Sequence, residues 1–422
     1  MPHAHRQSAA LAATAVLASV VLPADPAAGA PAAPAPAPAC APAYAAEAGA
    51  QALGIHRLGG DTALDVRIAE TRTGVAAPGS AATARPLGGT DGPDALTTPV
   101  TQTAPPQNPA ATTRGPATRT AGPFTLRRAT TSAHARWTPG LTCGTTTGPV
   151  TRAEARLGAA QAGDLLRAPA GLAAWNTTEL ARRGNAVHSV ATAAVEPGTL
   201  RILDGAATVT IVRGPHLTAA IAPAKGTARV DYRPPVVEVT APGTPPKRLT
   251  TPGATAEIPL DDRTESALLG ALPALATVGG VPLPGMPPLP GVPTLPSGRP
   301  ESAPAPDGTT LRVTLGTLKQ ATQGQAVAAR AVAVRLEIVG PGRDKQGYAH
   351  PALDADFGVL EAAAVAPLPP SARAAAAAPE GGQGAGLPVT GTSTGAVAGV
   401  GLTLLAAGLL LVGWTTRRRR TT

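Results

Sequence analysis

The sequence predicts a mainly β fold. We expect antiparallel sheets, sandwich-like or elongated, together with long disordered linkers rich in Pro, Gly and Ala and one C-terminal transmembrane helix. Three observations lead to this prediction. Short segments alternate apolar and polar residues at a spacing of about ten residues, which is typical of antiparallel strands. Gly and Pro number 48 each and separate these segments, and a long apolar run lies near the end of the chain. Because aromatic residues make up 2% of the chain, its core must be built from Ala, Val, Leu and Ile.

The first 30 residues are typical of a secretory signal peptide. Arg6 provides the positive charge of the n-region, and Ala9–Leu22 forms an uncharged apolar stretch. As a helix this stretch would rise only about 21 Å, which is short of the hydrocarbon core of a bilayer. The small residues Ala28, Gly29 and Ala30 follow as a cleavage site. We therefore expect signal peptidase to remove this segment.

Residues 31–262 are predicted to form a β-rich ectodomain, and residues 309–363 a second β-rich segment. Asp204-Gly205 is a hairpin-type dipeptide between two alternating runs. The predicted strands are 64–69, 200–203, 207–212, 216–221, 228–232, 235–239, 311–315 and 332–338.

Other parts of the chain are predicted to lack strands. The Thr/Pro/Gly/Ala-rich stretch at about 74–123 is expected to be a loop-like insertion. Residues 175–183 are a candidate helix, because Asn176 or Thr177 could cap its start. Residues 263–308 are a Pro-rich linker, in which a loose Pro-Leu-Pro-Gly repeat favours polyproline II. Residues 364–386 are an Ala/Pro/Gly-rich stalk that cannot bury enough apolar surface to fold.

The chain has two cysteines, Cys40 and Cys143. In an exported protein an even pair indicates one disulfide. This bond would close a loop of about 100 residues and contribute at most about 4–5 kcal/mol in the chain-entropy model. Two unpaired thiols are the alternative.

No catalytic, metal or cofactor motif stands out. The formal net charge of +9 is spread along the chain apart from its C-terminal cluster, and this excludes a nucleic-acid footprint. Asp354 and Asp356 would lie on one face of a strand and could bind a divalent ion, but a solvated edge is the simpler interpretation. A dispersed triad that includes His188 and Ser189 would need confirmation from their positions in the fold. We therefore predict that the chain is not an enzyme.

The C-terminus has the features of a membrane stop-transfer segment. Residues 392–416 are predicted to span the membrane, and their apolar centre, Ala396–Trp414, would rise about 28 Å as a helix. The tail, residues 417–422, contains Arg417, Arg418, Arg419 and Arg420. Because these arginines are costly to move through a bilayer, we expect the tail to stay in the cytoplasm.

A pentapeptide, Leu387-Pro388-Val389-Thr390-Gly391, precedes the apolar run. The order of pentapeptide, apolar run and arginines resembles the LPXTG-motif wall-anchored surface proteins of high-GC Gram-positive bacteria. The resemblance covers residues 387–422 and none of the ectodomain. It implies that a sortase transpeptidase recognises residues 387–391 and that its thiolate attacks the Thr390 carbonyl. Gly391 and the tail then leave, and an amine of a peptidoglycan precursor resolves the thioester.

The sequence therefore predicts a secreted protein that spans the plasma membrane transiently and is then anchored covalently to peptidoglycan through Thr390. Its ectodomain would be a structural or binding module with an unidentified ligand. One alternative is a wall-anchored enzyme that acts on cell-wall polymers, which a pocket collecting His, Asp and Glu would favour. Another is a single-span membrane protein that is never sorted.

Overall fold

The computed structural model describes residues 44–58, 64–89, 98–106, 109–121, 123–138, 140–141, 148–184, 186–260, 292–293, 295, 308–343 and 349–367. These residues are mainly β, and their sheets are antiparallel. Besides the strands they include a short 3₁₀ turn at Leu203–Gly205. The predicted fold class is thus confirmed at this level. The predicted signal peptide and transmembrane segment lie outside the described residues, as does the predicted stalk from residue 368 onward. The stalk prediction is wrong at its start, because Ala364 and Val365 are buried residues of β22.

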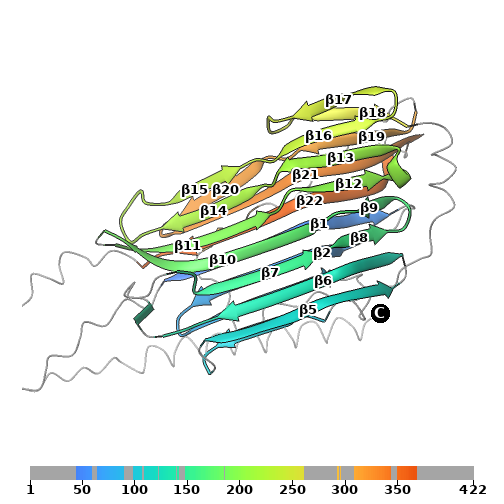
Figure 1. The fold of residues 1–422 in the computed structure, drawn as a ribbon. Helices are drawn as coiled ribbons and strands as arrows, with labels where there is room; N and C mark the ends of the chain where they lie inside the picture. The colour runs from blue at the N-terminus through green and yellow to red at the C-terminus, as the bar shows by residue number, and fades with distance from the viewer. Residues whose placement is uncertain are drawn as a thin grey trace, which may run out of the picture. The chain divides into compact units, whose positions relative to one another are not determined.

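The strands form two sheets, which we call sheet A and sheet B (Figure 1). Sheet A has the order β18-β19-β21-β22-β1-β2-β3-β4, and β20 also pairs with β21. Its strands are β1 (Ala45–Leu58), β2 (Val66–Ala76), β3 (Gly79–Gly88), β4 (Val100–Ala104), β18 (Thr255–Pro259), β19 (Thr310–Leu315), β20 (Leu318–Gln323), β21 (Ala326–Arg343) and β22 (Ala349–Val365).

Sheet B has the order β15-β14-β11-β10-β7-β6-β8-β9-β12-β13-β16-β17, and β5 also pairs with β6. Its strands are β5 (Ala110–Ala121), β6 (Phe124–Ala135), β7 (Thr151–Leu157), β8 (Ala159–Ala162), β9 (Leu166–Ala168), β10 (Leu172–Arg183), β11 (Ala186–Val195), β12 (Gly198–Ile202), β13 (Ala207–Arg213), β14 (His216–Ile221), β15 (Arg229–Arg233), β16 (Val236–Ala241) and β17 (Thr244–Leu249).

The chain begins in sheet A, continues through sheet B and ends in sheet A again, where β22 lies next to β1. It passes along β1–β4 in sheet A, crosses sheet B from β5 to β17, and re-enters sheet A at β18. The last strand, β22, then pairs with β1, so Val365 lies opposite Ala45. The β-rich segments before and after the Pro-rich linker therefore share one sheet and one core.

A transverse seam interrupts sheet A. Along β1 and β22, Gln51 pairs with Val359 and Leu53 pairs with Phe357. The residues between these two pairs, Ala52 and Gly358, are left out of the strand pairing. Ala69, Pro86 and Ala333 are skipped at the same level of their strands. Each strand therefore changes the parity of its inward-facing residues here, as a β-bulge does. In β1 the buried residues change from Ala46, Ala48, Ala50 and Ala52 to Leu53 and Ile55.

The seam continues into sheet B as a row of strand breaks. Gly158 separates β7 from β8, Pro169–Gly171 separates β9 from β10, and Gly214–Pro215 separates β13 from β14. Pro cannot donate a ladder hydrogen bond, and Gly weakens a strand interior. The two rows meet where Pro215 of sheet B lies against Gly358 of sheet A.

Two of the sequence predictions are wrong. The stretch at about 74–123 contains β3, β4 and β5, because Ala and Thr suffice as inward-facing residues where the two sheets lie close together. The candidate helix at 175–183 belongs to β10. There, buried Asn176, Thr178 and Leu180 alternate with less buried neighbours, and pairing with β7 and β11 overrides the local helix signals.

Candidate functional site

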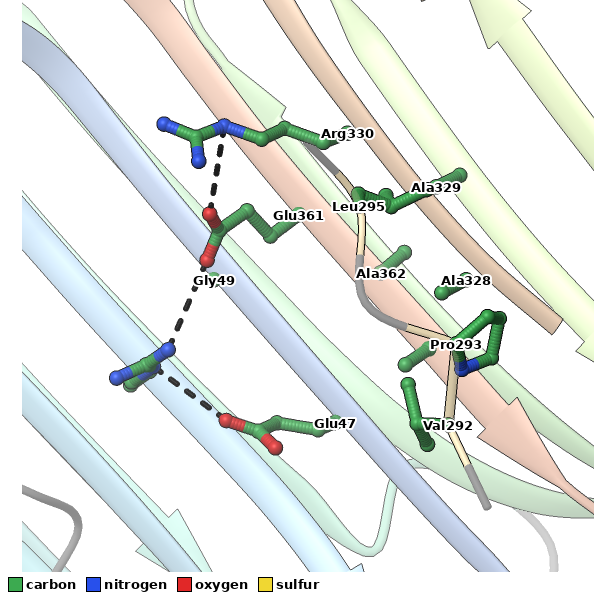
Figure 2. Close-up of a pocket in the computed structure, with 12 residues that line it drawn as sticks. Glu47, Gly49, Val292, Pro293, Leu295, Ala328, Ala329, Arg330, Glu361 and Ala362 are labelled. Atoms are coloured by element: carbon green, nitrogen blue, oxygen red, sulfur yellow. Dashed lines mark ion pairs between the residues drawn. The ribbon is translucent and has the colours of Figure 1, made fainter. Parts of the chain in front are cut away.

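Charged side chains gather on the outer face of sheet A, opposite the core. Because residues alternate across a strand, the central strands send every second side chain to this face. Arg330 of β21, Glu361 of β22, Glu47 of β1 and Arg72 of β2 form a row that we call the ion-pair ladder (Figure 2). The ladder thus joins strands from both ends of the chain.

The ladder is a continuous series of ion pairs. Arg330 Nε lies 3.6 Å from Glu361 Oε1, Arg72 Nη2 lies 3.6 Å from Glu361 Oε2, and Arg72 Nε lies 3.4 Å from Glu47 Oε1. Gly49 pairs in register with both Glu361 and Arg72, and these two side chains meet across β1 above Gly49. The four side chains are 32–42% exposed, so each pair contributes little to stability, about 0–1 kcal/mol.

Glu47 differs electrostatically from an ordinary surface glutamate. Burial raises the pKa of its carboxyl group, the Arg72 guanidinium lowers this pKa, and the neighbouring Glu361 raises it. The net effect is a raised pKa, so the fold favours the protonated form of Glu47 more than water does. Two carboxyl groups therefore share one arginine at this end of the ladder.

A pocket of about 310 Å³ adjoins the ladder on the same face. Arg67 lies in it and donates hydrogen bonds from Nε to Asp65 Oδ1 at 2.9 Å, from Nη2 to Asp65 Oδ2 at 3.0 Å and from Nη1 to Glu70 Oε1 at 3.0 Å. His56 Nε2 lies 3.0 Å from Asp356 Oδ2. The pocket therefore collects acidic side chains that are each paired with Arg or His, and it suits a polar, charged ligand.

The Asp-x-Asp pair is not a solvated edge, and that prediction is wrong. Asp354 and Asp356 are 5% and 8% exposed, because β22 is a central strand of sheet A with β21 on one side and β1 on the other. Asp354 Oδ1 lies 3.7 Å from Arg335 Nε, and Asp356 pairs with His56. Among the residues that the structure describes, no group of three His, Cys, Asp or Glu side chains is placed to hold a metal ion.

His188 and Ser189 do not form a catalytic pair. As neighbours in β11 they point to opposite faces of sheet B. Ser189 is fully buried, and its Oγ donates a 2.7 Å hydrogen bond to the carbonyl oxygen of Val365 in sheet A. This serine therefore links the two sheets.

The remaining predicted site residues lie outside the described part of the chain. They are Leu387, Pro388, Val389, Thr390, Gly391, Cys40, Cys143, Arg417, Arg418, Arg419 and Arg420. Within the described ranges, no helix has the length and apolar character needed to cross a membrane.

Sequence reasoning missed the ladder. Its members come from four strands that are distant in the sequence, and each is a single charged residue between uncharged neighbours, so no local motif marks them. Only the pairing of β22 with β1 brings Glu361 next to Glu47 and Arg72. No protein-family model matches this chain, and neither a curated protein nor a solved structure gives a significant match.

Proposed function

We propose that this protein is an exported surface protein, attached covalently to peptidoglycan through Thr390, whose β body serves as a binding or structural module. The observation that carries this proposal is the sequence Leu387-Pro388-Val389-Thr390-Gly391 followed by an apolar run and Arg417–Arg420. A sortase thiolate would form a thioester with Thr390 as the amide bond to Gly391 breaks. The amine of a peptidoglycan precursor would then form the new amide bond and release the thiolate.

The position of the last strand supports a tethered body. β22 ends at Val365, which lies opposite Ala45 at the start of β1. A tether that begins after Val365 would therefore hold the sandwich by the end at which Ala45 lies.

The outer face of sheet A supports a binding role for the body. The ladder and the neighbouring pocket place Arg67, Arg72 and Arg330 around one concave region, with acidic partners between them. Charged groups that are already paired and oriented can exchange partners with a charged ligand at low cost in side-chain entropy.

One observation favours the alternative, a wall-anchored enzyme that acts on cell-wall polymers. His56, Asp356, Asp65 and Glu70 line one pocket, and carboxyl groups are the acids and bases of glycoside hydrolysis. Incubating the purified chain with peptidoglycan and measuring released fragments would test this alternative. Activity that is lost in Asp356→Asn would support an enzyme over a binding module.

The anchoring proposal is tested by Thr390→Ala, with Thr392→Ala as the matched control. Cells that express each variant are broken, and their walls are boiled in detergent and then digested with muramidase. We expect the wild type and Thr392→Ala only in the muramidase-released fraction, and Thr390→Ala in the detergent extract. Equal covalent retention of Thr390→Ala in the wall would contradict the proposal.

A further inference from the structure

A small apolar surface on the outer face of sheet A is buried, although it faces away from the core. Ala45, Ala326 and Val365 are 5%, 3% and 9% exposed and form a hydrophobic cluster separate from the main core. We call these three residues, together with the neighbouring Ala328, the shelf. The shelf lies at the end of the sheet where β1 begins and β22 ends.

Part of the Pro-rich segment covers the shelf. Val292 packs against the cluster of Ala45, Ala326 and Val365. Val292, Pro293 and Leu295 line a pocket of about 220 Å³ together with Ala328, Ala362 and the ion-pair ladder. Figure 2 shows the segment running past the alanines, with the charged side chains beside it. This contact is long-range in the chain, because the segment belongs to an excursion between β18 and β19.

The chemistry of the shelf suits an extended proline-containing peptide. Alanine side chains and Gly49 leave room for a backbone to approach the sheet closely. Proline has no N–H to satisfy, and it favours the extended polyproline II conformation that costs little entropy to bind. Val292 supplies an apolar side chain that packs on the shelf, and Leu295 lines the pocket beside it.

The excursion contains two related sequences upstream of the one that reaches the shelf. Val281-Pro282-Leu283-Pro284 and Pro288-Leu289-Pro290 precede Val292-Pro293-Thr294-Leu295-Pro296. Among the described residues of the excursion, Val292 packs on the shelf, and it belongs to the last of these repeats.

We propose that the shelf is a recognition site for extended peptides of the type Val-Pro-x-Leu, and that the segment containing Val292, Pro293 and Leu295 occupies it within the same chain. The segment then acts as an internal competitor, and a peptide of the same chemistry binds only when the segment is displaced. If the segment occupies the shelf for nine-tenths of the time, the apparent affinity for an added peptide falls about tenfold. This inference does not depend on Thr390.

The test uses a fluorescent synthetic peptide of residues 290–297 and the purified full-length chain. Binding is measured by fluorescence anisotropy for the wild type, for Val292→Asp/Leu295→Asp, and for the control Val281→Asp/Leu283→Asp. We expect the first double variant to bind the peptide at least about tenfold more tightly than the wild type and the control. Adding Ala328→Glu to the first double variant should abolish this binding. Thermal unfolding of each variant reports that the fold is intact.

Three results would overturn the inference. They are no peptide binding by the folded Val292→Asp/Leu295→Asp chain, equal binding by the wild type, and binding that survives Ala328→Glu. A milder pair, Val292→Ala/Leu295→Ala, should give a smaller gain of the same sign. Because the readout is binding by the purified chain, it is independent of whether the protein is sorted to the wall.

Discussion

The seam divides the sandwich into two halves with different cores. In the half that contains Ala45, which we call the alanine half, the inward residues of sheet A include Ala46, Ala48, Ala50, Ala362 and Ala364. In the other half, the aliphatic half, they include Leu53, Ile55, Leu336, Ile338 and Phe357. The same strands thus change from small to large core residues at one transverse line.

The difference in side-chain size is matched by a difference in sheet spacing. In the alanine half, Cα atoms of β1, β2 and β22 approach those of β10 and β11 within 8 Å, whereas stacked sheets are usually about 10 Å apart. Polar side chains can then bond directly between the sheets. Asn176 Nδ2 donates a 3.1 Å hydrogen bond to the Ala48 carbonyl oxygen, and Ser189 bonds to Val365. In the alanine half, the two sheets are therefore held together by their close approach and by hydrogen bonds between them, where the aliphatic half relies on the burial of large apolar side chains.

The largest expected effect is in the aliphatic half. Phe357 is fully buried, and Phe357→Ala should lower the free energy of unfolding by about 3–5 kcal/mol, through lost burial and a residual cavity. Urea unfolding followed by circular dichroism measures this. Val212→Ala is the control, because Val212 is 48% exposed and should change stability by about 0.5 kcal/mol or less. A loss below about 1 kcal/mol for Phe357→Ala would mean that this half is not the main source of stability.

The second-largest loss of stability is expected for a substitution at the seam. Gly358 has φ +69°, and an added Cβ would lie 2.8 Å from Pro215 Cγ and 2.9 Å from Ala333 Cβ. Gly358→Ala should cost about 2–4 kcal/mol, from left-handed strain and overpacking together. Gly171→Ala is matched, because Gly171 has φ +51° and nothing within 4 Å, and it should cost only about 1–2 kcal/mol. Equal losses in thermal unfolding would show that the two sheets are not in close contact at the seam.

Enlarging an alanine tests the close approach of the sheets. Ala48→Leu should cost about 1–3 kcal/mol, because the added methyl groups have no space between β1 and the facing strand β10. Ala181→Leu is the control, since Ala181 lies on β10 and is only partly buried. If Ala48→Leu instead raised the urea midpoint, the alanine half would be underpacked and the account of its spacing would be wrong.

The smallest effect concerns pH and Glu47. The raised pKa of Glu47 makes the folded chain hold this proton to higher pH than the unfolded chain does. Stability therefore falls as pH rises from 4.5, the ordinary pKa of a glutamate, through the pKa in the folded chain. Glu47→Gln removes this dependence. Urea midpoints at pH 4 and pH 7 should show that the wild type loses more stability over this interval than the variant. Glu257→Gln serves as the control, and an equal loss in wild type and Glu47→Gln would contradict the assignment.

The aliphatic half was the easier part to predict from the sequence. Residues 207–212 and 311–315 alternate large apolar and polar side chains, and the structure confirms strands over these segments. In the alanine half the strands consist largely of small residues, as in 79–84 (Gly-Ser-Ala-Ala-Thr-Ala), and this pattern carries almost no hydropathy contrast. The missed strands β3, β4 and β5 belong to that part of the sequence.

The functional face could not be predicted for a different reason. The pairing of β22 with β1 joins residues more than 300 positions apart, such as His56 and Asp356, and no local pattern signals a pairing of that range. The seam also makes the outer face of sheet A hard to predict from the sequence. At the seam one residue of each strand has no partner in the pairing, so the side chains that point outward change from odd to even positions or the reverse. Within the predicted Pro-rich linker, Val292 packs against sheet A, and Pro293 and Leu295 line a pocket beside it.

The most direct test of the central claim is mass spectrometry of cell-wall fragments released by muramidase from wild-type cells. The account predicts a C-terminal peptide of this protein that ends at Thr390 and carries a peptidoglycan stem peptide in amide linkage. Recovery of the intact chain instead, with Arg417–Arg420 still attached and fully extractable by detergent, would contradict it.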